Sequence, residues 1–541
     1  MMRRMRAKLR ASKGSLVIYC VSFGMVPLLA SCGGGSSGPP PQQDFSVSVT
    51  PSATSMIVGT VSPPVVITVA GQNGFTGQVS IEISGLPPGA TSSPVTPFKV
   101  STSGNQQVVL FIPPTMQSGT LSLQFEATSG IHFHSAPLTL TVMPVSGTVG
   151  LQEVPGQVAA GTIEIQGLSA GTFNPTSWQQ NILNWVPDVR TPMLAAQTTG
   201  LYQNIYAPWP LEQPNGWRLF YGGWDGQDVP FDQIFSVTTS DFLSFANRDH
   251  IIANGGFLNV NNVNVQQLSD GSLHMICTGG QAANSGIGDK PVYFSSPDGV
   301  TWNGTPEPYS AQLTDVISMQ GYAPFNSDNF NGANVLLNDN GTWVLYFKDW
   351  SQFDTTYRAI AVTLPNFQFQ GAALKSNDFV QDVKKITVSG QSWYLMGLVE
   401  ADPKLSIFYS LTRDPANFPS QQTLFNHLYA LETNIVAMSF VTRGSQVLGI
   451  LYGADQGTPS GDLTGNAIFG RWLQKKVVIT NTLGLQYFAQ GSYGPDRQWF
   501  QGSSSGTLEG TMVVYAEDGI TPLGSSLVTL AAGKSYSLVL Q

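Results

Sequence analysis

Alternating hydrophobic and polar residues dominate the segment between residues 44 and 143. Apolar side chains recur there at every second position, as at Phe45, Val47 and Val49 near its start and at Leu138, Leu140 and Val142 near its end. A period of two places such side chains on one face of a strand, and the Gly, Pro and Ser residues between the runs predict turns. About seven runs over about 100 residues predict a two-sheet β-sandwich across residues 44–143.

A longer pattern repeats between residues 201 and 480. Each unit has a hydrophobic run, a turn, a second run rich in aromatic residues and two further runs, as in NNVNVQQLSDGSLHMICTG and GANVLLNDNGTWVLYFKDW. Five four-stranded units at a spacing of about 50–60 residues predict a five-bladed β-propeller. A sixth blade would require strands from the junction before the repeat or from the C-terminal run after it.

The remaining segments are expected to complete an all-β protein. Residues 144–200 are interpreted as a junction with a short helix between Pro175 and Trp185. Residues 481–541 are interpreted as propeller closure and a small β appendage with a turn at Asp518-Gly519. The 541 residues include 57 glycines and 35 prolines without a collagen-like period, which is typical of such a turn-rich protein. The expected fold class is therefore all-β: sandwich, propeller and appendage.

The N-terminus has the pattern of an exported protein. Residues 1–31 combine a basic start with an apolar stretch of about sixteen residues, which is short for a membrane span and typical of a signal peptide. Leu29-Ala30-Ser31-Cys32 resembles the lipobox of bacterial lipoproteins, which implies lipidation of Cys32. Residues 32–43 form a Gly/Ser/Pro tether. Gly33 implies outer-membrane sorting by the same resemblance, so we expect a lipid-anchored protein on the periplasmic or cell-surface face.

The net charge and the cysteine content limit which partners and which disulfides are expected. The chain carries 24 Lys and Arg against 33 Asp and Glu, and six of the basic residues would leave with the signal peptide. An acidic surface cannot replace the counterions of a nucleic acid, so nucleic acid is not expected as a partner. After processing, Cys277 would be the one free thiol, expected to be buried, and no intramolecular disulfide is expected. We expect a monomer.

One face of the predicted propeller gathers carboxylates and tryptophans. Antiparallel pairing brings the start of each inner strand, the end of the second and the start of the third to the same face. The carboxylates and tryptophans at or near these positions are Asp225, Asp232, Asp349, Asp382, Glu400, Glu432, Trp209, Trp224 and Trp350. Carboxylates bind sugar hydroxyls, and aromatic rings pack against the C–H patches of a sugar ring. We therefore expect a carbohydrate ligand, with Asp232, Asp382, Glu432 and the three tryptophans as binding residues.

The segments GWRLFYGGWD, DQIFSVTTSDF and VLYFKDW resemble five-bladed propeller glycoside hydrolases related to arabinanases, xylosidases and fructosidases. This resemblance implies hydrolysis of O-glycosidic bonds by two carboxyl groups at a defined separation. The first inner strand of that family begins with Asp-Pro, whereas this protein has Ala207-Pro208 and lacks a Glu-Gly-Pro or Glu-Cys-Pro motif. The candidate catalytic residues are therefore Glu400, Asp349 and Asp225. No cofactor is required, and a structural Ca²⁺ in the propeller channel is compatible with the resemblance.

Two functions stay open. A surface-anchored glycoside hydrolase is favoured because one face of the propeller supplies many carboxylates. The alternative is a glycan-binding or adhesion lipoprotein without catalysis, because the family's acid and base motifs are missing.

Three smaller motifs are expected to be structural. Ser296-Pro297-Asp298-Gly299-Val300-Thr301-Trp302 resembles the Asp-box turn of sialidases, with Trp302 packed between blades. His132 and His134 share one strand face and could form half of a metal site, but no third ligand is near in sequence, which favours two surface histidines. The run NGFTGQVSIEISGLPPGATSSP resembles immunoglobulin-like modules of secreted soil-bacterial proteins, which implies a spacer.

Overall fold

The computed structural model describes residues 42–146, 149–156, 158–197, 199–225, 232–282, 288–326, 334–349, 352–426, 432–456, 465–502 and 506–540. These residues form two compact units. The first covers the described residues up to Ser55 together with Ser62–Leu110 and Thr120–Thr141. The second covers Met56–Val61, Phe111–Gly119 and the described residues from Val142 onward. Each unit is described separately below.

The first unit is a β-sandwich, as its alternating pattern predicts. One sheet has the order β1-β3-β7-β5 and the other β2-β9-β8-β4-β6. The strands are β1 (Asp44–Thr50), β2 (Ala53–Ile57), β3 (Val65–Gln72), β4 (Gln78–Ser84), β5 (Thr91–Ser93), β6 (Phe98–Ser101), β7 (Asn105–Phe111), β8 (Gly119–Ser129) and β9 (His132–Met143). Phe45, Ile67, Ile81, Leu110 and Phe125 are fully buried, because the alternating positions of both sheets meet between them.

The second unit contains five sheets that correspond to the five sequence repeats. Blade one consists of β13 (Asn204–Gln213), β14 (Gly216–Trp224), β15 (Gln233–Thr239), β16 (Ala246–Ala253) and the short β22 (Tyr309–Ser310). Blade two consists of β17 (Phe257–Gln267), β18 (Leu273–Ala282) and β19 (Lys290–Ser296), followed by the hairpin of β20 (Thr301–Trp302) and β21 (Thr305–Pro306). Blade three consists of β24 (Val335–Asp339), β25 (Thr342–Lys348), β26 (Thr355–Ala361), β27 (Asn366–Lys375) and β23 (Ser318–Gln320).

Blade four consists of β28 (Phe379–Val388), β29 (Gln391–Val399), β30 (Ser406–Thr412) and β31 (Gln422–Asn426). Blade five consists of β32 (Glu432–Arg443), β33 (Gln446–Gln456), β34 (Asn466–Leu473) and β12 (Trp185–Pro187). The inner strands β13, β17, β24, β28 and β32 contact one another in a closed ring, in which β32 returns to β13. The prediction of a five-bladed propeller is therefore confirmed in the described part of the chain.

The junction contributes more to the fold than its sequence suggests. Its strand β12 pairs antiparallel with β34, so the outer strand of the last blade comes from a segment that precedes the first blade. This pairing closes the ring with main-chain hydrogen bonds. The expected helix is α1 (Pro175–Gln180), whose Asn174 side chain accepts the first-turn Thr176 N–H and whose Trp178 is buried.

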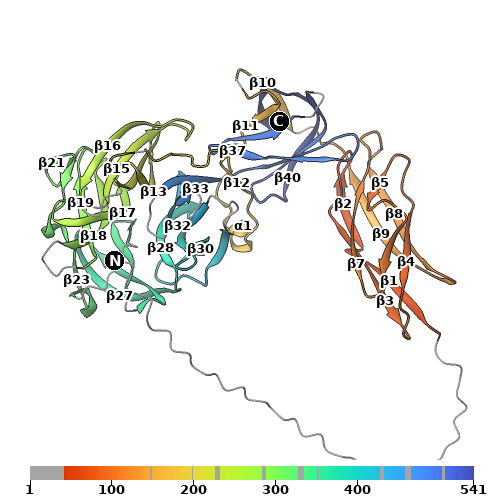
Figure 1. The fold of residues 1–541 in the computed structure, drawn as a ribbon, viewed down its shortest axis with the longest axis horizontal. Coiled ribbons are helices and arrows are strands. Elements are labelled where there is room, and N and C mark those ends of the chain that lie inside the picture. Colours follow the sequence, from red (N-terminus) through yellow and green to blue (C-terminus); the bar gives the residue numbers. More distant parts are fainter. Residues whose placement is uncertain are drawn as a thin grey trace, which may run out of the picture. The chain divides into compact units, whose positions relative to one another are not determined.

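A C-terminal β domain combines both ends of the second unit. Strands β10 (Val149–Val154) and β11 (Thr162–Gln166) pair with β41 (Lys534–Leu540) and β38 (Arg497–Gln501), and β37 (Gly491–Tyr493) completes that sheet. A second sheet contains β36 (Gln486–Phe488), β35 (Lys476–Thr480), β39 (Thr507–Tyr515) and β40 (Pro522–Ala531). Strands β10, β11, β37 and β40 lie together near the C-terminus (Figure 1). The expected junction and appendage therefore form one domain.

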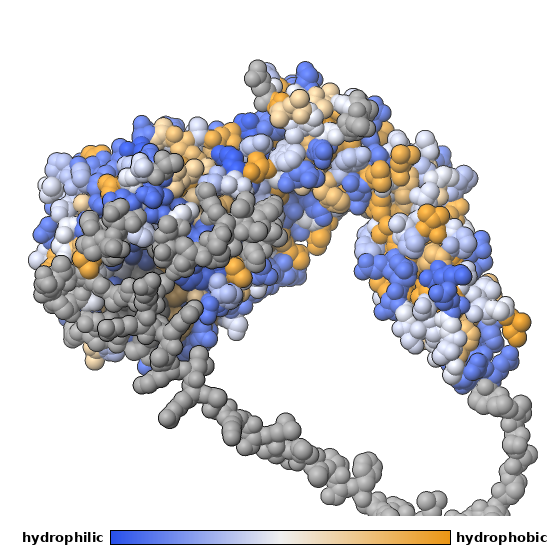
Figure 2. All heavy atoms as spheres, in the orientation of Figure 1, coloured by the Kyte–Doolittle hydropathy of each residue, from blue (hydrophilic) through white to orange (hydrophobic). Residues whose placement is uncertain are grey.

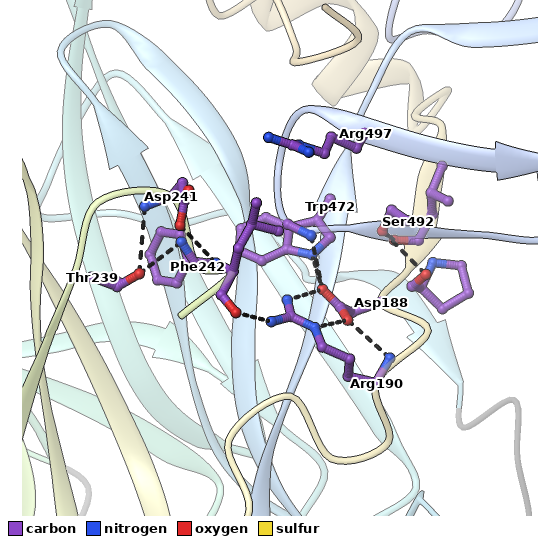
Figure 3. Close-up of polar contacts among 12 residues, drawn as sticks. Asp188, Arg190, Thr239, Asp241, Phe242, Trp472, Ser492 and Arg497 are labelled. Atoms are coloured by element: carbon purple, nitrogen blue, oxygen red, sulfur yellow. Dashed lines mark hydrogen bonds and ion pairs between the residues drawn. The ribbon is translucent and has the colours of Figure 1, made fainter. Parts of the chain in front are cut away.

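Asp188 connects this domain with the closing blade (Figure 3). Its buried carboxylate accepts hydrogen bonds from Trp472 Nε1 of β34 at 2.9 Å and from the Gly494 N–H, which follows β37, at 3.0 Å. Arg190 Nη2 pairs with it at 2.7 Å, and Arg190 Nη1 donates to the Leu243 carbonyl of blade one. One carboxylate thus holds the first and last blades and the C-terminal domain at a common point.

Candidate functional site

In blades one and five, the strand register brings the start of the inner strand, the end of the second strand and the start of the third strand to one face. In blade one, Asn204 at the start of β13 lies opposite Trp224 at the end of β14, and Gly223 lies opposite Gln233 of β15. In blade five, Glu432 lies opposite Gln456, and Asp455 lies opposite Asn466. Side chains from these strand ends therefore share a face, and their individual contacts decide what each can do.

Among the described residues, the inner strands approach one another closely at the centre of the ring. Inner strands β13, β17, β28 and β32 have irregular register at similar positions, and Ala207 and Ala437 adopt positive φ values of 51° and 64°. Tyr206, Ala207 and Ala437 form an apolar cluster with Val436 packed against it. The cavity at this level measures about 10 Å³, and its lining residues are Ala207, Pro208, Trp209, Asn262, Val263, Asn334, Gln381, Ala437 and Met438. A cavity of this size holds about one water molecule, so a sugar ring cannot enter it.

Asp382 and Trp209 are engaged with a buried lysine. Asp382 is fully buried, and its Oδ2 accepts hydrogen bonds from Ser439 Oγ at 2.9 Å and from the Phe440 N–H at 2.8 Å. Lys384 Nζ lies 3.4 Å from Asp382 Oδ1 and 3.4 Å from the centroid of the Trp209 ring. Burial raises the pKa of Asp382 and lowers that of Lys384, and each charge opposes the shift of the other.

These contacts change the roles expected for both residues. Trp209 is 2% exposed, donates from Nε1 to the Val265 carbonyl and carries Lys384 over its ring, which leaves no ring face for a sugar. Asp382 neutralises Lys384 rather than contacting a ligand. A Ca²⁺ ion needs six to eight oxygen ligands, and the Lys384 ammonium would repel it. The described channel residues do not fit a calcium ion, and no described group of three or more His, Cys, Asp or Glu residues could hold a metal.

Glu432 belongs to a second buried ion pair. Its Oε2 lies 2.6 Å from Arg471 Nη2, and its Oε1 accepts a hydrogen bond from the Tyr452 hydroxyl at 2.8 Å. Arg471 also lies over the Phe425 ring at 3.7 Å, and both charged side chains are 2% exposed. Glu432 therefore stabilises blade five, and both its oxygens are occupied within the protein. The expected role in binding a sugar is not compatible with this environment.

Asp232 is a buried carboxyl group directly before β15, on the same face. It is 6% exposed and accepts a hydrogen bond from Asn261 Nδ2 at 3.3 Å. Burial raises the pKa of Asp232 to about 6, although Tyr206 and Asn261 partly oppose the rise. Such a group can be protonated near neutral pH, which is the state that a general acid requires.

The other expected site residues are dispersed. Asp349 is fully buried and accepts a 2.5 Å hydrogen bond from the Tyr322 hydroxyl. Asp225 and Trp224 are half-buried at the end of β14 and have polar or ring contacts of their own. Trp350 and Cys32 lie outside the described residues. Neither Asp349 nor Asp225 lines the groove that contains Glu400.

That groove lies between the third and fourth blades and has a volume of about 670 Å³. Its lining residues are Phe353, Lys375, Ser376, Asn377, Asp378, Glu400, Ala401, Asp402, Phe408, Ser420 and Gln421. They come from the loops after β25, β27 and β29, from β30 and from the loop before β31, so they lie near the ends of the second strands and the start of an inner strand. The size is that of an ordinary ligand site, and the lining combines two phenyl rings with three carboxylates and amides.

Two of the three carboxylates of this groove accept hydrogen bonds from the main chain. Glu400 Oε2 accepts a hydrogen bond from the Leu405 N–H at 2.9 Å, and Asp378 Oδ1 accepts one from the Ala401 N–H at 3.1 Å. Beneath them, the buried Lys348 donates to the carbonyls of Phe353 and Ser376 and so ties two lining loops together. Burial lowers the pKa of Lys348 to about 8, while Asp378 and Asp354 oppose the shift. These hydrogen bonds hold the loops that line the groove in place.

Sequence reasoning placed Glu400 at the end of a second strand, directly after β29, but did not identify the residues that line the groove with it. Phe353 and Phe408 carry no motif, and Asp378 and Asp402 are separated from Glu400 by 22 and 2 residues along the sequence. The usable signal is positional, because Phe353, Glu400 and Asp402 all follow the end of a second strand. Which two blades would leave a gap between such loops depends on side-chain packing.

The smaller motifs have the expected structural roles. Asp298 Oδ1 accepts hydrogen bonds from the Val300 and Thr301 N–H groups at 2.9 and 2.7 Å, and these bonds lower the pKa of Asp298 to about 2. Trp302 is fully buried in the core of blades one and two. Cys277 is also fully buried, and burial raises the pKa of its thiol. Asp518 makes the same contacts with the N–H groups of residues 520 and 521.

No protein-family model and no curated protein matches this sequence. Solved structures do match, among them a protein described as a glycoside hydrolase, at 10% identity over 56% of this protein and 95% of that one with a TM-score of 0.40. A thermostable family-43 glycoside hydrolase matches at 11% identity, over 54% and 95% of the two proteins, with a TM-score of 0.36. Endo-arabinase from Bacteroides thetaiotaomicron VPI-5482 matches at 11% identity, over 51% and 96%, with a TM-score of 0.34. Likeness at this level assigns neither an activity nor a residue role to this protein.

Proposed function

We propose that this protein is a lipid-anchored, glycoside hydrolase-like propeller that binds a polysaccharide in the groove between blades three and four. The observation that carries the proposal is the groove itself, in which Phe353 and Phe408 lie beside Asp378, Glu400 and Asp402. Aromatic rings supply the apolar contact for a sugar ring, and the oxygens around them accept hydrogen bonds from its hydroxyls.

Binding without cleavage agrees with the small cavity and the paired carboxylates near the centre of the propeller. Hydrolysis needs two carboxyl groups about 5–10 Å apart around an open space for the sugar. Ala207 occupies the position where the family resemblance implies an aspartate, and the cavity beside it measures about 10 Å³. Asp382 and Glu432 are paired with Lys384 and Arg471. We therefore place the ligand at the side of the ring and assign Glu400 to binding.

Hydrolysis is the second candidate, and Asp232 is the observation that favours it. Its raised pKa of about 6 would keep part of the population protonated near neutral pH. Under this alternative, Asp232 gives a proton to the leaving oxygen, and a second carboxyl group on the same face activates water. Release of reducing ends that is lost in Asp232→Asn would support hydrolysis.

Anchoring at Cys32 completes the proposal. The lipobox-like sequence and the tether at residues 32–43 support export and lipidation. The described residues contain no helix of sufficient length and hydrophobicity to cross a membrane. A lipid-anchored sandwich would then hold a polysaccharide-binding propeller as a monomer at the outer membrane.

The test uses residues 33–541 with insoluble and soluble polysaccharides from plants and microbes. Retention on the polymer and release of reducing ends are measured in parallel. We expect retention without release, and a loss of retention of about tenfold in Phe408→Ala, since one stacked aromatic ring contributes about 1–1.5 kcal/mol. Tyr493→Ala is the matched control because Tyr493 is an exposed aromatic residue outside the groove. Equal retention by both variants would refute the groove as the binding site.

A further inference from the structure

The sandwich presents two exposed apolar side chains at the turn between β8 and β9. Ile131 is 86% exposed and Phe133 is 59% exposed, although the next residues of β9 alternate regularly between buried and exposed positions. In Figure 2, hydrophobic residues reach the surface among hydrophilic ones at the lower end of the first unit. Both side chains lie in a six-residue segment, so they can contact one flat surface together.

This turn lies beside the first described residues of the sequence. Asp44, the first residue of β1, accepts a 2.8 Å hydrogen bond from His134 Nε2 and lies 3.2 Å from His132 Nδ1. The turn after β3 is held at the same end, because Asn73 Nδ2 donates to the Gln42 carbonyl at 2.9 Å. The two histidines expected as isolated surface residues therefore fasten the β8–β9 turn to the start of β1.

The charge of this end suits a lipid surface. Residues 42–45, 72–77 and 129–134 contain one acidic residue, Asp44, and no lysine or arginine. The Asp44 carboxylate is hydrogen-bonded to His134 and lies 3.2 Å from His132, so it is engaged within the sandwich. Phe75 packs against Phe45 and His132, which keeps the end compact. An apolar tip whose one carboxylate is engaged in a hydrogen bond can enter the headgroup region of a bilayer.

The length of the tether brings the tip within reach of the anchor. Asp44 lies twelve positions after Cys32 in the sequence. Twelve residues of any chain span at most about 40 Å when fully extended. A sandwich anchored at Cys32 therefore holds its Asp44 end close to the membrane throughout, whereas the other end of β9 lies about 40 Å along the strand.

We propose that Ile131 and Phe133 insert into the headgroup region of the membrane that anchors Cys32. The lipid and the tip would then form two points of contact, which fix the direction of the sandwich relative to the bilayer. This inference rests on the lipid anchor of the proposed function and is independent of the polysaccharide groove.

The test uses the lipidated full-length protein on vesicles of phosphatidylethanolamine and phosphatidylglycerol. Phe133→Cys is labelled with an environment-sensitive dye, and Val95→Cys is the matched control because Val95 is 75% exposed in the same sandwich. Cys277 is buried and Cys32 would be acylated, so the label goes to the introduced cysteine. Val95 lies away from the β8–β9 turn, since the neighbouring Thr96 Oγ1 accepts the N–H of Ile83, which pairs with Phe125 in the middle of β8.

We expect dye emission at position 133 to rise at least about twofold on vesicles, with little change at position 95. Equal responses at both positions, or no response at 133 while the protein floats with the vesicles, would overturn the inference. Mass spectrometry of the N-terminal peptide reports lipidation separately, and an unmodified Cys32 would overturn the inference through its premise. Retention of the same preparation on polysaccharide measures the groove, so failure of the tip and failure of the groove give different results.

Discussion

Replacing Asp188 by alanine tests how the propeller is closed. The Asp188 side chain is fully buried. Its carboxylate pairs with Arg190 and accepts hydrogen bonds from Trp472 Nε1 and the Gly494 N–H. Removing it leaves the two fully buried neutral donors, Trp472 Nε1 and the Gly494 N–H, without an acceptor at about 1–3 kcal/mol each, and it also removes the acceptor of the partly buried Arg190 N–H. Arg190 is 23% exposed and can turn toward water, so its charge adds little to this cost. We expect the free energy of unfolding to fall by about 2–6 kcal/mol.

The assay is differential scanning calorimetry of the full-length protein. For a unit of this size, about 2 °C of melting temperature corresponds to 1 kcal/mol, so the second unit should melt about 4–12 °C lower. Hydrogen exchange should also show faster exchange in β12 and β37, because both strands lose the common contact. Asp188→Asn keeps one acceptor oxygen, and we expect an intermediate effect.

Asp241→Ala is the matched control in the same region (Figure 3). Its carboxylate accepts one main-chain hydrogen bond, from the Leu243 N–H at 2.8 Å, in a partly buried position. We expect a loss below about 1 kcal/mol. If Asp188→Ala melts within about 1 °C of Asp241→Ala, the reasoning that one buried carboxylate holds the closure is refuted.

Three further predictions concern buried and turn-forming carboxylates. Arg471→Met should lower the stability of the second unit by about 3–5 kcal/mol in thermal unfolding, because Glu432 keeps its charge without a partner. The double variant with Glu432→Leu should recover most of the lost stability. Equal instability of the single and double variants would contradict the ion-pair argument. Asp232 has a pKa of about 6 in the folded protein and an ordinary value near 3.8, so the folded state binds more protons than the unfolded state between these pH values. The free energy of unfolding should therefore fall by roughly 3 kcal/mol as the pH rises from about 4 to about 6. Asp232→Asn should remove this contribution to the pH dependence of stability. Asp298→Ala should speed hydrogen exchange of the Val300 amide without displacing the buried strands, and unchanged exchange would show that the turn does not depend on the carboxylate.

The positions of some candidate site residues could be predicted from the sequence, but their contacts could not. Antiparallel pairing alone placed Asp232, Glu400 and Glu432 near one face, and the register bears this out for the strand ends of blades one and five. Pairing does not specify partners, however. Glu432 meets Arg471, and Asp382 meets Lys384 across Trp209, because side chains from different strands and blades pack together. Those partners turn expected ligand contacts into internal ion pairs.

The sequence by itself determined the strands and the number of blades. A period of two, regular turn residues and a fifty-residue repeat are local properties, and each blade forms from consecutive strands, so their order follows from the sequence. Tertiary structure alone decided how the ring closes and where a ligand can enter. Strand β12 completes blade five across nearly 290 residues, and the groove exists because loops from two blades leave space between them. Such long-range packing depends on the fit of side chains in three dimensions, which no local pattern encodes.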